Sequence, residues 1–119
     1  MHFKKQTKWF KIFDAEFLKE NQLKLKVPIT VEVGNKTVCL VKLPEGYFAV
    51  SDICPHQGAS LSEGYCTDQN IVCPWHHYEF NLKSGRQAEG GGDYVMTFPV
   101  EIRKDGLYIG IERNVFSLF

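Results

Sequence analysis

Residues 54–56 read Cys-Pro-His and residues 73–76 read Cys-Pro-Trp-His, with 16 residues between His56 and Cys73. Each half of this pattern supplies one thiolate and one imidazole, and this donor set suits a thiophilic metal. Zinc and iron–sulfur clusters are the main candidates. The sequence therefore predicts four metal ligands: Cys54, His56, Cys73 and His76.

The pairing of unlike ligands within each half favours an iron–sulfur cluster over zinc. Zinc sites commonly pair like ligands, as in C-x(2–4)-C followed by H-x(3–5)-H. Here each half can give one ligand to each metal of a two-iron cluster. One iron then holds Cys54 and Cys73 and the other holds His56 and His76, which is the Rieske ligation of a [2Fe–2S] cluster.

The rest of the chain reads as a β framework around this site. Segment 52–92 is rich in Gly, Pro, Cys and His, and it indicates a site built from loops. Asp14 is the expected N-cap of a short helical turn over residues 15–20. Many short strands separated by turns predict an all-β sandwich or partly open barrel. Strands are predicted at residues 8–13, 23–33 (in two pieces joined at Pro28), 37–43, 47–51, 94–98, 99–103 and 107–112, with turns at 34–35, 44–46 and 104–106.

The chain resembles the Rieske ferredoxin family, the small electron carriers of bacterial ring-hydroxylating oxygenase systems. The resemblance rests on the two ligand motifs and on residues 49–53, 61–64, 80–85 and 98–109, and it spans residues 8–112. It implies stacked antiparallel sheets with a small cluster-binding subdomain, made of two loops at residues 52–92. The chain's 119 residues are expected to form this single domain.

The resemblance also implies a function. One [2Fe–2S] cluster on the four ligands carries single electrons from a flavin-dependent reductase to a terminal oxygenase. The chain itself is expected to have no catalytic site, because it has no room for an oxygenase domain. Two alternatives stay open: a small Rieske subunit of a larger reductase such as nitrite reductase, and a zinc-stabilised structural module.

Positions beside the ligands predict a low reduction potential. High-potential members of the family carry a disulfide in the cluster loops, and its positions are Ala59 and Trp75 here. The positions of a serine and a tyrosine hydroxyl are Tyr78 and Phe80. Fewer hydrogen bonds to the cluster lower the potential, so we expect the lower part of the Rieske range, about −150 mV and somewhat above.

His77 stands where the family usually has glycine after the second histidine ligand. Glycine there relieves a tight turn, whereas histidine tolerates a positive φ only moderately. Two interpretations stay open: an exposed side chain next to a ligand, or a third imidazole that tunes the potential.

Charge and composition restrict the partners. The net charge is zero and no apolar run reaches the roughly 18 residues of a membrane span, so neither nucleic acid nor a bilayer is expected as a partner. The N-terminus lacks a secretory signal, which favours a reducing, cytoplasmic setting. Residues 43–93 carry seven acidic and two basic residues, net −5, and are either a docking face or simply solvated. The acidic residues near the ligands are Asp52, Glu63, Asp68 and Glu79.

The remaining notable residues have structural interpretations. Cys39 is expected to be a buried core thiol and Cys66 a free structural thiol. The apolar tail 115–119 either packs back on the sheet or meets another subunit, and the sequence does not decide between them.

Overall fold

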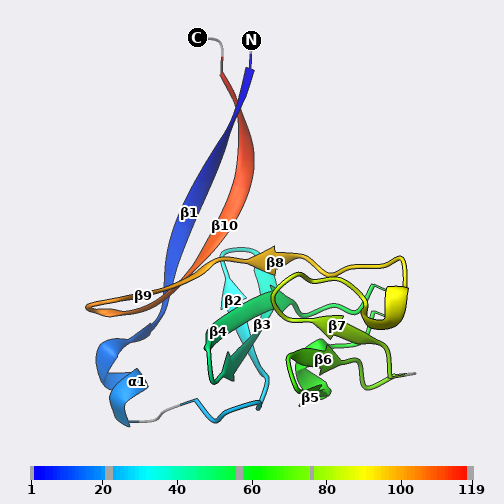
Figure 1. Cartoon of the computed structure of the whole chain (residues 1–119). Helices are drawn as coiled ribbons and strands as arrows, with labels where there is room; N and C mark the ends of the chain where they lie inside the picture. Colours follow the sequence, from blue (N-terminus) through cyan, green and yellow to red (C-terminus); the bar gives the residue numbers. More distant parts are fainter. Residues whose placement is uncertain (1, 21–22, 56–57, 76, 118–119) are drawn as a thin grey trace.

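The computed structural model describes residues 2–20, 23–55, 58–75 and 77–117 (Figure 1). These residues form three antiparallel sheets with strand orders β1-β10-β9, β2-β3-β4-β8 and β5-β6-β7. The predicted all-β architecture of stacked antiparallel sheets is therefore confirmed. In chain order the elements are β1 (His2–Asp14), α1 (Ala15–Glu20), β2 (Ile29–Val33), β3 (Lys36–Leu43), β4 (Gly46–Ser51), the 3₁₀ helix η1 (Leu61–Glu63), β5 (Tyr65–Thr67), β6 (Asn70–Val72), β7 (Glu79–Asn81), the 3₁₀ helix η2 (Ala88–Gly90), β8 (Thr97–Phe98), β9 (Val100–Arg103) and β10 (Gly106–Ser117).

Strand β3 separates two hydrophobic cores. Successive side chains of a strand point to opposite faces of the sheet. Val38 and Leu40 pack in a core shared with β10, whereas Cys39, Val41 and Leu43 pack in a core shared with β6 and β7. The sheet of β3 is therefore a middle layer, and the second core attaches the segment that carries the predicted ligands to it.

The predicted turns and the helical turn are confirmed. Gly34 and Asn35 join β2 to β3, and Lys104 and Asp105 join β9 to β10. Gly106, which follows the second turn, has φ +155°, and a Cβ there would lie 2.1 Å from the carbonyl oxygen of Phe13. Asp14 caps α1, because its Oδ1 accepts a hydrogen bond of 2.9 Å from the backbone N–H of Phe17.

Strands β1 and β10 are longer than predicted. They pair from Asp14 opposite Gly106 to His2 opposite Ser117, and Figure 1 shows their outer part as a two-stranded ribbon that leaves the body of the molecule. The backbone of residues 115–117 continues β10 in this ribbon, and neither interpretation of the apolar tail is tested by this pairing. Residues 118 and 119 lie outside the described residues.

Three other predictions of local structure need correction. Residues 23–27 form only one isolated bridge, between Leu25 and Lys42, because Lys26 adopts φ +60° and Pro28 follows. The strand predicted at 94–98 is reduced to β8. Segment 52–92 is not made of loops alone, because it contains the three-residue strands β5, β6 and β7.

Candidate metal centre

Two backbone-closed loops carry the predicted cysteine ligands. We call residues 54–59 loop 1 and residues 73–78 loop 2. Loop 1 is closed by a hydrogen bond of 2.8 Å from the N–H of Cys54 to the carbonyl of Ala59, and loop 2 by one of 2.7 Å from the N–H of Cys73 to the carbonyl of Tyr78. The two loops are thus closed in the same way: in each, the N–H of the cysteine at the first position donates to the carbonyl of the residue five positions later.

The thiols of Cys54 and Cys73 meet in the core between the sheets. Their residues are 1% and 0% exposed, and neither forms a disulfide. The pKa of Cys73 is raised by burial and by the neighbouring thiol of Cys54, while the backbone of Trp75 opposes the rise. Two convergent buried thiols are soft donors, so this pair fits one metal of a cluster.

The imidazole half of the predicted ligand set is not visible. His56 and His76 lie outside the described residues, although the sequence places one in each loop. No group of three metal-ligating side chains is found among the described residues, which include both cysteines and neither histidine.

The comparisons with known proteins identify the family. Residues 8–95 match the model of the Rieske [2Fe-2S] domain. The chain belongs to the Rieske [2Fe–2S] domain family. One Rieske cluster is the cofactor of this family, and the convergent thiols fit it.

Relatives similar to this Rieske domain include ferredoxins. The ferredoxin component of the alkene monooxygenase system of Xanthobacter autotrophicus is 32% identical over 82 residues, which cover 68% of this chain and 67% of the relative. The ferredoxin subunit of the 3-phenylpropionate/cinnamic acid dioxygenase of Photorhabdus laumondii is 39% identical over 70 residues, 57% of this chain and 67% of that one. These relatives are electron-carrier components, not catalytic subunits.

Solved structures share the fold. A chain from the complex of reduced oxygenase and oxidized ferredoxin in carbazole 1,9a-dioxygenase has a TM-score of 0.71 at 26% identity, over 84% of this chain and 99% of that one. The putative small subunit of an NADPH nitrite reductase has a TM-score of 0.72 at 23% identity, over 86% and 97% of the two chains.

Residues around the two loops divide into a buried base and an exposed rim. Leu61, Ile71 and Phe80 of the base are fully buried. Trp75 is 54% exposed and belongs to the rim. The other large apolar side chains of the rim are those of Ile53 and Tyr65.

The structure describes all four positions at which the sequence differs from high-potential Rieske proteins. Ala59, which is buried, and Trp75, which is exposed, have no thiol, so no disulfide can join the two loops at these positions. Phe80 is buried in the core without a hydroxyl, and Tyr78 packs half-buried against the same core.

His77 adopts the backbone conformation that favours glycine. Its φ is +58°, and its exposed side chain lies near the ring of Tyr65, with 6.4 Å between the ring centroids. The first interpretation of His77, an exposed side chain beside a ligand position, agrees with this geometry.

The acidic residues near the ligands have different environments. Glu63 and Asp68 are exposed, but only Glu63 lies near the loops, because Asp68 lies in the turn of β5 and β6 and lines a hollow with Lys26 and Glu45. Glu79 is half-buried and accepts a hydrogen bond of 2.5 Å from Thr67 Oγ1. Asp52 is only 4% exposed, so the expectation that it belongs to a solvated or docking face of acidic residues was wrong. Asp52 instead accepts hydrogen bonds from residues that follow loop 1.

The other two cysteines fit their predicted roles. Cys39 is fully buried on β3, and Cys66 is half-buried on β5. Burial raises the pKa of both thiols, with Asp52 adding to the rise at Cys39.

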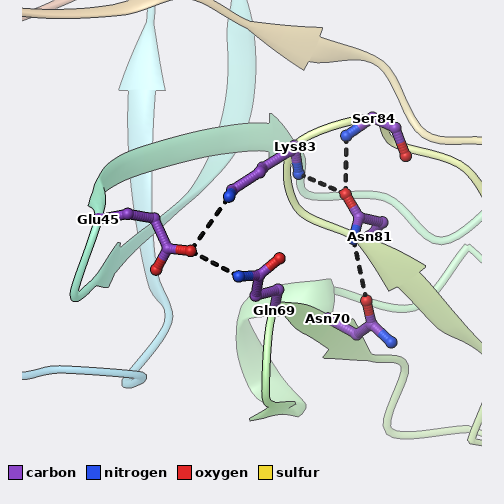
Figure 2. Close-up of polar contacts among 6 residues, drawn as sticks. All are labelled: Glu45, Gln69, Asn70, Asn81, Lys83 and Ser84. Atoms are coloured by element: carbon purple, nitrogen blue, oxygen red, sulfur yellow. Dashed lines mark hydrogen bonds and ion pairs between the residues drawn. The ribbon is translucent and has the colours of Figure 1, made fainter.

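A polar network that sequence reasoning missed joins the segment carrying the loops to the middle sheet (Figure 2). Glu45, in the turn between β3 and β4, accepts a hydrogen bond of 2.6 Å from Gln69 Nε2, and its Oε2 lies 3.1 Å from Lys83 Nζ. Asn81 Oδ1 in turn accepts the backbone N–H groups of Lys83 and Ser84, both at 2.9 Å. These contacts hold the turn of β5 and β6 and the end of β7 against the turn between β3 and β4.

Proposed function

We propose that this chain is a one-electron carrier whose [2Fe–2S] cluster is held by Cys54, His56, Cys73 and His76. The observation that carries the proposal is the meeting of two buried thiols from two loops, each of which contains one histidine in the sequence. A cluster with this ligation supplies reversible one-electron reduction.

The chain's own residues hold and shield the ligands. The closing hydrogen bonds of loops 1 and 2 fix the backbone at both cysteines. The buried base, with Leu61, Ile71 and Phe80, excludes water from beneath them. Burial raises the pKa of Cys73, and the backbone of Trp75 partly opposes that rise.

The proposed docking surface is the rim together with the exposed Glu63. Ile53, Tyr65 and Trp75 offer apolar contact area, and Glu63 offers negative charge. Such a surface fits partners with basic faces and gives an association rate that falls with salt. We assign these partners as a flavin-dependent reductase and a terminal oxygenase, because the ferredoxin relatives are components of oxygenase systems.

The proposed setting is the cytoplasm, and the proposed unit is one Rieske domain over residues 1–119 with the cluster-binding subdomain at about residues 52–92. The four cysteines, all described, are free thiols, as a reducing compartment favours. No helix among the described residues has the length and apolar character to cross a membrane.

A second candidate is the small Rieske subunit of a larger reductase. It is supported by the fold shared with the putative nitrite reductase subunit, at a TM-score of 0.72. The two candidates differ in stable binding: a reductase subunit stays bound to a larger subunit, whereas a carrier does not.

Purification of the tagged chain from its own cells separates the two candidates. A carrier is expected to elute alone and to be reduced by one electron per chain in a titration with dithionite. Its reduced form should then be reoxidised by a terminal oxygenase. A large flavin or haem subunit that stays bound at high salt would contradict the stand-alone carrier and favour the reductase subunit.

A further inference from the structure

Asp52 is the one buried charged side chain among the described residues. It follows the last residue of β4 and precedes Cys54 by two positions. Burying a carboxylate is costly unless hydrogen bonds compensate for the lost water, so its environment calls for a physical explanation.

Asp52 fastens the two ends of loop 1 to each other. Its Oδ2 accepts a hydrogen bond of 2.5 Å from Ser60 Oγ, and its Oδ1 accepts one of 2.8 Å from the backbone N–H of Ser62. Its own carbonyl accepts the N–H of Leu61 at 2.6 Å, and its N–H donates to the carbonyl of Thr37 at 3.1 Å. Asp52, two positions before loop 1, is therefore hydrogen-bonded to the three residues that follow the loop and to the neighbouring strand β3.

The contacts of Asp52 are with neutral groups. A chain of hydroxyl groups, from Ser60 through Ser62 to Thr30, leads from the carboxylate to the surface. No lysine or arginine pairs with Asp52 among the residues that the structure describes. A buried charge without a counter-ion is screened weakly by salt and acts over a longer range than a surface charge.

The field of Asp52 reaches the core that contains the ligand thiols. The pKa of Cys39 is raised first by burial and then by the negative charge of Asp52. Cys39 belongs to the same core as Cys54 and Cys73. Asp52 thus places a buried negative charge two residues before the predicted ligand Cys54 and beside the core that contains both ligand thiols.

We propose that Asp52 is a positioning residue that holds loop 1 and a fixed negative charge that lowers the midpoint potential of this Rieske domain. The inference rests on the proposed function, because it concerns the cluster bound by loop 1. Reduction adds one electron to the cluster, and a nearby buried negative charge makes that addition less favourable. The same residue thus sets the shape of the loop and makes the carrier a stronger reductant.

The test is a redox titration at a fixed neutral pH, followed by circular dichroism of the cluster. Asp52→Asn keeps the size and one acceptor oxygen but removes the charge, so its midpoint should rise. The matched control is Glu63→Gln, which removes an exposed charge near the same loop. Its shift should be smaller and should vanish at high salt, whereas the shift of Asp52→Asn should persist. A shift of Asp52→Asn that is no larger than that of Glu63→Gln, or equally salt-sensitive, overturns the charge role.

Ser60→Ala separates position from charge. It keeps the carboxylate and withdraws one hydrogen bond from it, so the midpoint should fall and iron should be released faster to a chelator. A midpoint that stays constant or rises overturns the charge role, and an unchanged rate of iron release overturns the positioning role. These tests remain decisive if Asp52→Asn cannot retain a cluster.

The wild-type protein separates this inference from the proposed function. A wild-type chain without the spectrum of a two-iron cluster defeats the proposed function itself. A wild-type chain with that spectrum, combined with unshifted variants, defeats only the role of Asp52.

Discussion

The thiols of Cys54 and Cys73 are neighbours in one buried core, although 19 positions separate them in the sequence. Each cysteine begins a loop whose fifth following residue accepts its backbone N–H. Sheet β5-β6-β7 brings the two loops together, because β6 ends at Val72 immediately before Cys73 and β5 begins soon after η1. Local turns and one small sheet are thus sufficient to create the thiol pair.

The thiol pair gives the first prediction. Cys54→Ala and Cys73→Ala should each yield a colourless protein without acid-labile sulfide, because one iron loses a ligand. Cys66→Ala, at the half-buried thiol of β5, is the control and should keep its colour. Iron and sulfide analysis of the purified variants is the measurement. Equal loss of iron in Cys66→Ala would contradict the assignment of the ligands.

The second prediction concerns the backbone at His77. A left-handed conformation costs a non-glycine residue about 1–2 kcal/mol, and part of the relief in a glycine variant is lost to the greater freedom of its unfolded chain. His77→Gly should therefore raise the free energy of unfolding by about 0.5–1 kcal/mol. Urea titration followed by circular dichroism measures it.

Asp68→Gly is the matched control for His77→Gly. Asp68 has φ +50° in the turn of β5 and β6, and a smaller stabilisation is expected there, because aspartate tolerates this conformation better than histidine. The midpoint potential should be unchanged in both variants if His77 is an exposed side chain. A shift confined to His77→Gly would instead support the interpretation of His77 as a tuning imidazole.

The sequence predicts the local features of the fold well. The turns at Gly34-Asn35 and Lys104-Asp105 and the cap at Asp14 depend on residues a few positions apart, and the structure confirms all three. The outer part of β1 and β10 depends on pairing between the two ends of the chain. A pattern within either segment carries no information about such a partner.

The site is predictable to a similar degree. The ligand motifs and the absence of the disulfide follow from residue identity alone. The burial of Asp52 does not, because an acidic residue in a polar segment normally indicates solvent exposure. The signal that could have found it is the set of short hydrogen-bonding side chains at Asp52, Ser60 and Ser62 on both sides of loop 1.

The polar network at Glu45 gives a prediction on pH. The pKa of Glu45 is lowered, first by a backbone hydrogen bond and then by Lys83. A lowered folded-state pKa means that the carboxylate stabilises the protein above its unfolded pKa, near about 4.3, and that this contribution is lost as the pH falls through the folded-state value. Glu45→Gln should therefore unfold more easily than wild type at neutral pH and equally easily in acid.

Urea titrations of Glu45→Gln from about pH 7 down to about pH 3 measure this difference. Glu16→Gln, on the exposed face of α1, is the control and should follow wild type throughout. A constant difference between Glu45→Gln and wild type at every pH would show that the carboxylate charge does not contribute.

The proposed docking surface predicts a dependence on ionic strength. The rate of reduction by a reductase should fall as salt rises, because exposed charges are screened within about 8–10 Å at physiological salt. Glu63→Gln should lower the rate at low salt and weaken its salt dependence. Glu16→Gln should do neither, and stopped-flow kinetics measure all three. A rate that is indifferent to salt in wild type would contradict electrostatic steering.

The most direct test of the central claim is pulsed electron paramagnetic resonance of the reduced protein, together with metal and sulfide analysis of the same sample. We expect about two iron and two sulfide per chain, and nitrogen couplings from two imidazoles on one iron. His56→Ala and His76→Ala should each remove a nitrogen coupling or the whole cluster. Zinc without sulfide, or an iron–sulfur cluster without coupled nitrogen, would contradict a Rieske cluster held by Cys54, His56, Cys73 and His76.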